Sequence, residues 1–78
     1  MKLIVLNLPR NFSEQDLEAL FKAHGAVNAC NLVMDDKTGK SKGFGFVEMA
    51  LEEEAVAAIE KLHGTKIKQS RIRVKPAT

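Results

Sequence analysis

The chain of 78 residues is long enough for one small domain and too short for two. With 45% apolar and 28% charged residues, its composition is globular and excludes an intrinsically disordered chain. A single cysteine, Cys30, excludes an internal disulfide, and a net charge of +2 is too small to define a partner before its distribution is known. We therefore expect one domain over residues 1–78 that is stabilised by packing alone.

The first apolar run, Leu3 to Leu6, is too short for the core of a signal peptide or for a membrane span. It leads into an asparagine and a proline rather than into further apolar residues. We expect neither secretion nor membrane attachment. The expected location is the cytoplasm, or the nucleus if the source is a eukaryote.

The first predicted elements are a strand and a well-marked helix. KLIVLNL, residues 2–8, is rich in branched aliphatic side chains and is closed by a proline, which predicts a strand. Ser13 is a good N-cap, and Asp16 three residues later completes a shortened capping box. Apolar residues then recur at helical spacing until Gly25, a good terminator, so we predict a helix over residues 13–24.

Two strands joined by a polar loop are predicted next. Residues 27–34 are mainly apolar but keep no strict alternation, which predicts a strand with a β-bulge. DDKTGKSK, residues 35–42, contains a glycine and three lysines and predicts a long hairpin loop. The strand after this loop is KGFGFVEM, residues 42–49.

The last predicted elements are a helix and a basic strand. Residues 52–63 place apolar side chains on one helical stripe and begin with three glutamates, which the helix dipole favours. RIRVK, residues 71–75, alternates apolar and basic side chains before a proline and predicts a strand. The order βαββαβ predicts an α+β sandwich, in which a four-stranded antiparallel sheet carries both helices on one face.

The phenylalanines of KGFGFVEM need an explanation. Strand alternation places Phe44 and Phe46 on one face and Val47 with Met49 on the other. If Val47 and Met49 face the helices, both rings stand on the uncovered face beside the basic side chains of the last strand. Aromatic rings next to cations form a surface for base stacking with phosphate partners. In the alternative, a sheet covered on both faces, the rings would be core residues.

KGFGFVEM also matches seven of the eight positions of the RNP1 signature and misses only the last. LIVLNL, residues 3–8, is similar to the RNP2 motif, and the similarity extends through DDKTGKSKGFGFV and AVAAIEKLHG to SRIRVKPA. Over essentially its whole length the chain resembles the RNA recognition motif family. The resemblance implies a ferredoxin-like βαββαβ fold and the binding of single-stranded RNA without catalysis.

The resemblance also implies roles for individual residues. It assigns stacking on a base to Phe46, packing against bases and sugars to Phe44, and a phosphate contact to Lys42. Ile4 occupies the RNP2 position that usually holds an aromatic ring, and Met49 replaces the last RNP1 aromatic. The predicted RNA-contacting residues are Lys2, Ile4, Leu6, Asn7, Lys40, Lys42, Phe44, Phe46, Arg71, Arg73 and Lys75.

Two classes of function stay open at this point. The first is a monomeric module for single-stranded RNA, with single-stranded DNA as a further ligand and no cofactor or metal. The second is a protein-interaction domain on the same fold, using the aliphatic patch of Ile4 and Leu6. The chain resembles the short stand-alone RNA recognition motifs of bacteria, and an excised eukaryotic domain would look the same.

Chemistry-bearing residues have plainer explanations than catalysis. Cys30 is better explained as a small buried apolar residue than as a nucleophile. His24 and His63 lie at predicted helix ends, without the neighbours that metal binding needs. An enzyme on this fold would need a glycine-rich phosphate loop after the first strand, and the sequence there contains no glycine.

Overall fold

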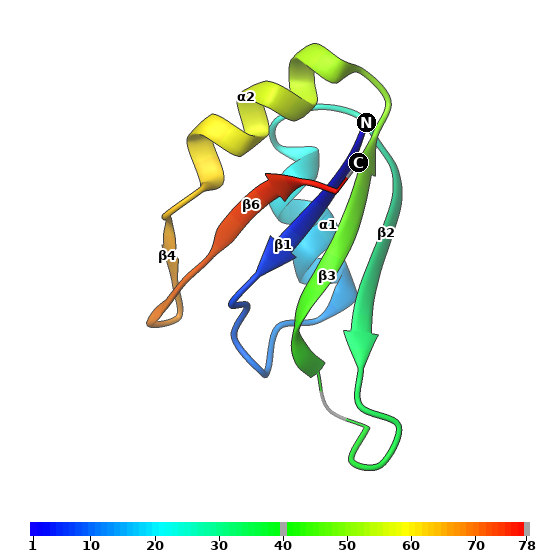
Figure 1. Ribbon diagram of the computed structural model, residues 1–78, viewed down its shortest axis with the longest axis vertical. Helices are drawn as coiled ribbons and strands as arrows, with labels where there is room; N and C mark the ends of the chain where they lie inside the picture. Colours follow the sequence, from blue (N-terminus) through cyan, green and yellow to red (C-terminus); the bar gives the residue numbers. More distant parts are fainter. Residues whose placement is uncertain (40, 78) are drawn as a thin grey trace.

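The computed structural model describes residues 1–39 and 41–77, without the side chains of residues 41 and 42. The elements follow the predicted alternation of strands and helices, with a small additional ribbon near the end of the chain (Figure 1). In chain order they are β1 (Lys2–Leu6), α1 (Glu14–Lys22), β2 (Val27–Met34), β3 (Ser41–Met49), α2 (Glu52–Leu62), β4 (Lys66–Ile67), β5 (Ser70–Arg71) and β6 (Arg73–Pro76). Both helices are slightly shorter than the ranges predicted for them.

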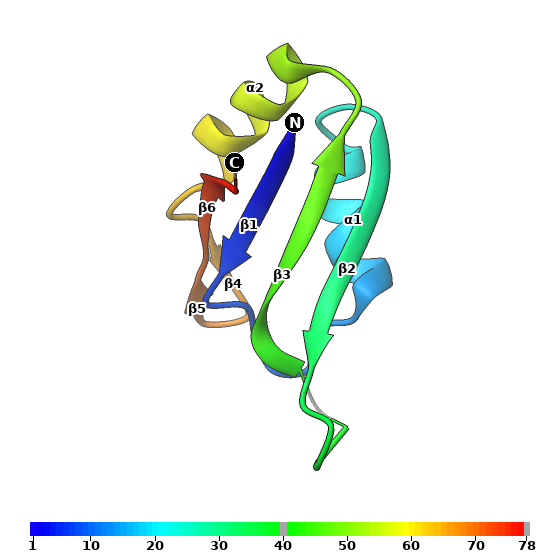
Figure 2. The same cartoon turned by 45° about the vertical axis from the view of Figure 1, so that its right-hand side comes forward.

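Four strands form one antiparallel sheet in the order β2-β3-β1-β6, and both helices lie on the same face of it (Figure 2). This is the predicted ferredoxin-like sandwich. Its core lies between the sheet and the helices, where every second strand residue meets the apolar stripes of α1 and α2. The core residues are Leu3, Val5, Leu8, Phe12, Leu17, Phe21, Leu32, Val47, Met49, Ala55, Ala58, Leu62, Ile72 and Val74.

The start of α1 is fixed by the predicted capping box. The Ser13 hydroxyl accepts a hydrogen bond from the backbone N–H of Asp16 at 3.0 Å, and Oδ2 of Asp16 accepts one from the N–H of Ser13 at 3.1 Å. These two bonds satisfy N–H groups that have no partner within the helix. Hydrogen bonding to Ser13 holds the pKa of Asp16 below its ordinary value. The bond from the Ser13 backbone N–H has the largest effect, and the bond with the Ser13 side chain the second largest.

Side chains near the helices cover backbone groups at both edges of the sheet. In edge strand β2, the N–H of Leu32 donates to Oε2 of Glu14 at 3.3 Å. In edge strand β6, the N–H of Val74 donates to Nδ1 of His63 at 3.1 Å. Unpaired edge groups are templates for pairing with another chain. Glu14 and His63 therefore protect the edges and tie the helices to the sheet.

The end of the chain corrects one prediction, because residues 71–75 are not a single strand. The N–H of Ile72 donates to the carbonyl of Thr65 at 2.9 Å, and its carbonyl accepts from the N–H of Gly64 at 2.8 Å. These bonds hold Ile72 against the turn after α2 rather than in the sheet. As a result Arg71 belongs to β5, and β6 begins only at Arg73.

The ribbon formed by β4 and β5 turns at Lys68 and Gln69, whose φ angles are 47° and 75°. Two-residue hairpin turns with positive φ usually contain asparagine or glycine. Since Lys-Gln is not such a pair, the sequence carries no hairpin signal here, and the ribbon was not predicted.

Candidate nucleic-acid interface

The open face of the sheet is the face without helices, and the central strands divide their side chains cleanly between it and the core. Leu3 of β1 and Val47 of β3 are both 0% exposed and face the helices. Their neighbours Ile4, Phe44 and Phe46 point the other way and remain partly exposed. The two phenylalanines therefore stand on the uncovered face, as the alternation of KGFGFVEM predicts.

A row of four side chains crosses the open face through Phe46. In the register of the sheet, Phe46 of β3 pairs with Ile4 of β1 on one side and with Asn31 of β2 on the other. Ile4 in turn pairs with Lys75 of β6. Because neighbouring strands lie only about 4.8 Å apart, one nucleotide at Phe46 can contact side chains of several strands.

The two phenylalanine rings form a pair next to a cation. Their centroids are 6.3 Å apart and their planes meet at 84°, an edge-to-face arrangement. The ammonium of Lys2 lies 5.1 Å from the centroid of Phe46, within the range of a cation–π interaction. The open face thus presents π surface and positive charge at the same place.

Gly45, between the two phenylalanines, is required by the packing on the other side of the strand. A Cβ atom at this position would lie 2.7 Å from the carbonyl oxygen of Asn31 and 3.0 Å from Cδ2 of Leu17 in α1. A larger residue would therefore push β3 away from β2 or from the helix. The glycine lets β3 lie close to both while its phenylalanines project to the open face.

Basic residues lie on the β6 side of the open face, beyond β1. Arg73 pairs with Leu6 of β1, and Lys75 pairs with Ile4, so both cations border the aliphatic residues of the open face. Arg71 is exposed but lies in the β4–β5 ribbon. The structure therefore brings Arg73 and Lys75 into the sheet surface and places Arg71 beyond its end.

Of the remaining predicted RNA-contacting residues, the structure describes the side chain of Asn7 but not those of Lys40 and Lys42. Asn7 adopts a positive φ of 61°, and its Nδ2 donates to the carbonyl of Arg71 at 2.8 Å. Its amide thus anchors the ribbon beside the end of β1. Lys40 lies outside the described residues, as does the side chain of Lys42, so the roles expected for both stay predictions.

Sequence reasoning missed Asn31 as a member of this face. Its exposed amide lies opposite Phe46, but the register of β2 shifts between Val27 and Ala29 and again between Leu32 and Met34. These irregularities confirm the predicted bulge. They also explain the miss, because simple alternation does not carry through a bulge.

Charge is divided between the two layers of the molecule. Seven of the ten acidic residues lie on α1 and α2, whereas the open face carries Lys2, Arg73 and Lys75. Among the described strand residues, Glu48 of β3 is the single acid. A polyanion would therefore be attracted to the sheet and repelled by the helices.

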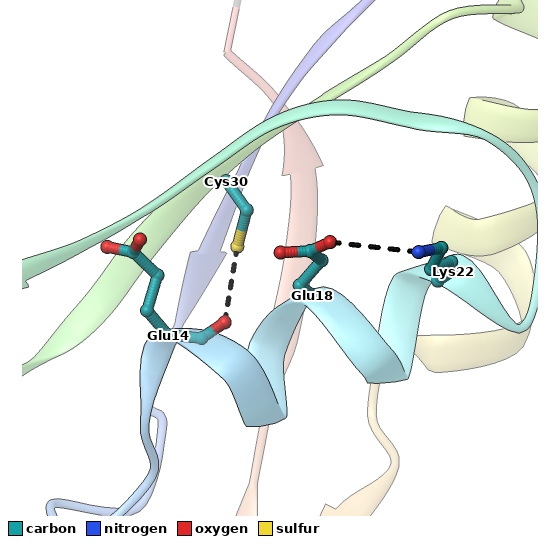
Figure 3. Close-up of polar contacts among 4 residues, drawn as sticks. All are labelled: Glu14, Glu18, Lys22 and Cys30. Carbon is teal, nitrogen blue, oxygen red and sulfur yellow. Dashed lines mark hydrogen bonds and ion pairs between the residues drawn. The ribbon is translucent and has the colours of Figure 1, made fainter.

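Cys30 lies on the helix side of β2, away from the open face. Its Sγ donates a weak hydrogen bond to the carbonyl of Glu14 at 3.6 Å (Figure 3). Burial, with the nearby carboxylates of Glu14 and Glu18, raises the pKa of the Cys30 thiol to about 11. The thiol is therefore protonated at neutral pH, and a protonated thiol is a poor nucleophile.

Other features of the surface lie apart from the open face. A hollow of about 660 Å³ lies at the start of α1, lined by residues that include Arg10 and Met34, and none of the predicted RNA-contacting residues lines it. Within residues 1–39 and 41–77, no group of three or more His, Cys, Asp or Glu side chains is arranged to hold a metal ion. In the same described ranges, no helix is long and apolar enough to cross a membrane.

The fold and the open face define the class of this protein. The chain matches the RNA recognition motif family over residues 3–73, and it belongs to that family.

Its relatives include proteins that are much longer than this chain. A Sex-lethal homolog of Megaselia scalaris is 40% identical over 72 residues, which are 92% of this chain and 22% of that protein. The chain thus spans about a fifth of the length of this curated relative. The crystal structure of RNA binding protein PG1 is 40% identical, with a TM-score of 0.94 over 99% of this chain and 93% of that chain. A solved Sex-lethal protein/RNA complex is 38% identical, with a TM-score of 0.94 over 99% of this chain and 46% of that chain.

Proposed function

We propose that this RNA recognition motif binds single-stranded RNA on the open face of its sheet and catalyses no reaction. The observation that carries the proposal is the pair of partly exposed rings, Phe44 and Phe46, at the centre of a bare and cationic sheet surface. The solved complex of Sex-lethal protein with RNA, which shares this fold at 38% identity, supports it.

Stacking is the main interaction that we assign to this surface. A base laid on Phe46 exchanges water for π contact, and a second nucleotide packs against Phe44. Each base–aromatic stack is worth about 1–3 kcal/mol and tolerates any base. Ile4, next to Phe46 in the register, adds van der Waals contact but no π surface. The role that we assign to the rings and aliphatic side chains of this face is contact with bases rather than catalysis.

Phosphates are the second partner that we assign to this surface. Lys2 of β1 lies next to Phe46, and Arg73 and Lys75 of β6 lie one strand further away, beside Leu6 and Ile4. A strand of RNA crossing from β3 to β6 would place its backbone next to these cations. Binding of this kind releases counterions and weakens as salt is added.

The competing function is protein docking on Ile4 and Leu6. In the structure these two residues pair with Lys75 and Arg73 and lie in one surface with the phenylalanines. They do not form a separate patch. No separate observation therefore favours protein docking. It would become the preferred function only if the protein bound no RNA. A monomeric state and a cytoplasmic location stay predictions.

The test is a titration of short, fluorescently labelled single-stranded RNA of random sequence into the wild type and Phe46→Ala at low salt. Loss of the ring should weaken binding by about 1–3 kcal/mol. Leu51→Ala is the matched control, because Leu51 is 57% exposed and precedes α2, away from the open face.

Chemical denaturation of each variant checks its folding, and a DNA strand of the same length tests whether the sugar matters. Equal binding by the wild type and a folded Phe46→Ala variant would contradict the proposal. Absence of binding by the wild type would favour protein docking instead.

A further inference from the structure

Glu48 is out of place on a surface that binds a polyanion. It is exposed on β3 and lies two residues after Phe46, so both side chains project from the same face of the strand. A carboxylate here repels phosphate and lowers general affinity for RNA. Its position beside the stacking ring offers a compensating role in contact with a base.

The position of Glu48 relative to the proposed stack follows from the register of the sheet. Residues two apart on a strand are separated by about 6.8 Å, so the glutamate side chain reaches the edge of a base that lies on Phe46. Lys2 pairs with Glu48 across β1 and β3, and its ammonium lies 5.1 Å from the Phe46 centroid. A base that stacks on this side of the ring displaces the ammonium to the edge of the base, where the ammonium and the carboxylate lie side by side.

The chemistry of this pair matches one base better than the others. An ionised carboxylate only accepts hydrogen bonds, and it can accept two from adjacent donors, whereas an ammonium only donates. The Watson–Crick edge of guanine presents two adjacent donors, N1–H and the 2-amino group, next to the acceptor O6. Uracil has one donor between two acceptors, and adenine and cytosine each have one amino group beside an acceptor.

We infer that Glu48, assisted by Lys2, selects guanine among the bases that stack on Phe46. The inference rests on the proposed function, since it needs a base on that ring. In this arrangement the two oxygens of Glu48 accept from N1–H and the 2-amino group, and Lys2 donates to O6. Stacking supplies affinity for any base, and the charged pair supplies the preference.

The experiment compares two RNA pentamers, UUGUU and UUIUU, in which inosine (I) differs from guanosine only by the missing 2-amino group. A single purine among uridines can occupy the Phe46 position in any register of binding. Wild type should bind UUGUU roughly tenfold or more tightly than UUIUU, the worth of one hydrogen bond to a charged group, because inosine keeps N1–H and loses only the 2-amino donor. UUAUU, UUCUU and UUUUU should also bind less tightly than UUGUU.

The variant that isolates the carboxylate is Glu48→Gln. An amide has one acceptor oxygen and cannot take both donors, so UUGUU and UUIUU should bind alike. Glu60→Gln is the matched control, because it removes the same charge from an exposed residue of α2. It should keep the full preference.

Each outcome decides the question. Equal binding of UUGUU and UUIUU by the wild type, or a preference that survives Glu48→Gln, would overturn the role of Glu48 while the proposed function stands. Loss of the preference in Glu60→Gln would overturn it too, because charge alone would then be the cause. If no pentamer binds the wild type, the proposed function fails together with this inference.

Discussion

The two faces of the sheet are built from the same strands but have different roles: one packs against the helices, and the other is open to a ligand. On the helix side, Leu3 and Val47 pair with each other across β1 and β3 and are completely buried. One position further along each strand, Ile4 and Phe46 also pair, but they remain partly exposed on the open face. The first pair stabilises the fold, and the second is available for a ligand. Stability and recognition can therefore be changed separately by substituting adjacent residues.

The largest expected effect is the loss of stability on the helix side. Leu3→Ala removes a fully buried side chain and leaves a cavity, which should lower the free energy of unfolding by about 2–5 kcal/mol. This loss is a large fraction of the whole, because the free energy of unfolding of a protein is only about 5–15 kcal/mol. Urea unfolding followed by circular dichroism measures the change.

Ile4→Ala is the control for Leu3→Ala, since it alters the neighbouring residue on the other face of β1. Its loss of stability should be clearly smaller, because the side chain is already partly exposed. If both variants lost the same stability, the two faces would not differ in the way described.

A smaller effect is expected from adding an aromatic ring to the open face. Ile4→Phe places a ring opposite Phe46, on a strand position that accepts aromatic residues well. A further base–aromatic stack should tighten RNA binding by up to about 3 kcal/mol, with little change in stability. Titration of short single-stranded RNA, with urea unfolding as the control, measures both quantities. Unchanged or weaker binding by the folded variant would mean that β1 carries no base.

The smallest expected effect concerns the cations of β6. Binding of a few phosphates should make the logarithm of the affinity fall with the logarithm of the salt concentration, with a slope of about 2 to 3 in magnitude. Arg73→Ala should reduce that magnitude by about 0.7, the contribution of one single-strand phosphate.

Lys61→Ala is the control for Arg73→Ala, because it removes the same charge from an exposed residue in the last turn of α2. Its slope should equal that of the wild type. A slope that Arg73→Ala leaves unchanged would place the RNA away from β6.

The sequence was sufficient to predict both helices, the first three strands of the sheet and the division of their side chains between the faces. The capping box of Ser13 and Asp16, the bulged strand over residues 27–34 and the alternation around Phe46 are all set by residues close together in the chain. Backbone geometry, helix capping and strand alternation are local effects, so a short stretch of sequence reports them. The placement of both rings on one face was predictable for the same reason, whereas the exposure of that face followed from the order of the elements.

Only the tertiary structure decided how distant segments combine. The pairing of Asn31 with Phe46 depends on the bulges of β2, and the bond from Asn7 to the Arg71 carbonyl joins residues 64 positions apart. The division of the last segment into a ribbon and β6 depends on the hydrogen bonds of Ile72 with the turn after α2. Such contacts are set by long-range pairing and by the shape of the packed core. No short-range pattern in the sequence predicts these contacts, because each one forms only when two segments far apart in the chain are brought together.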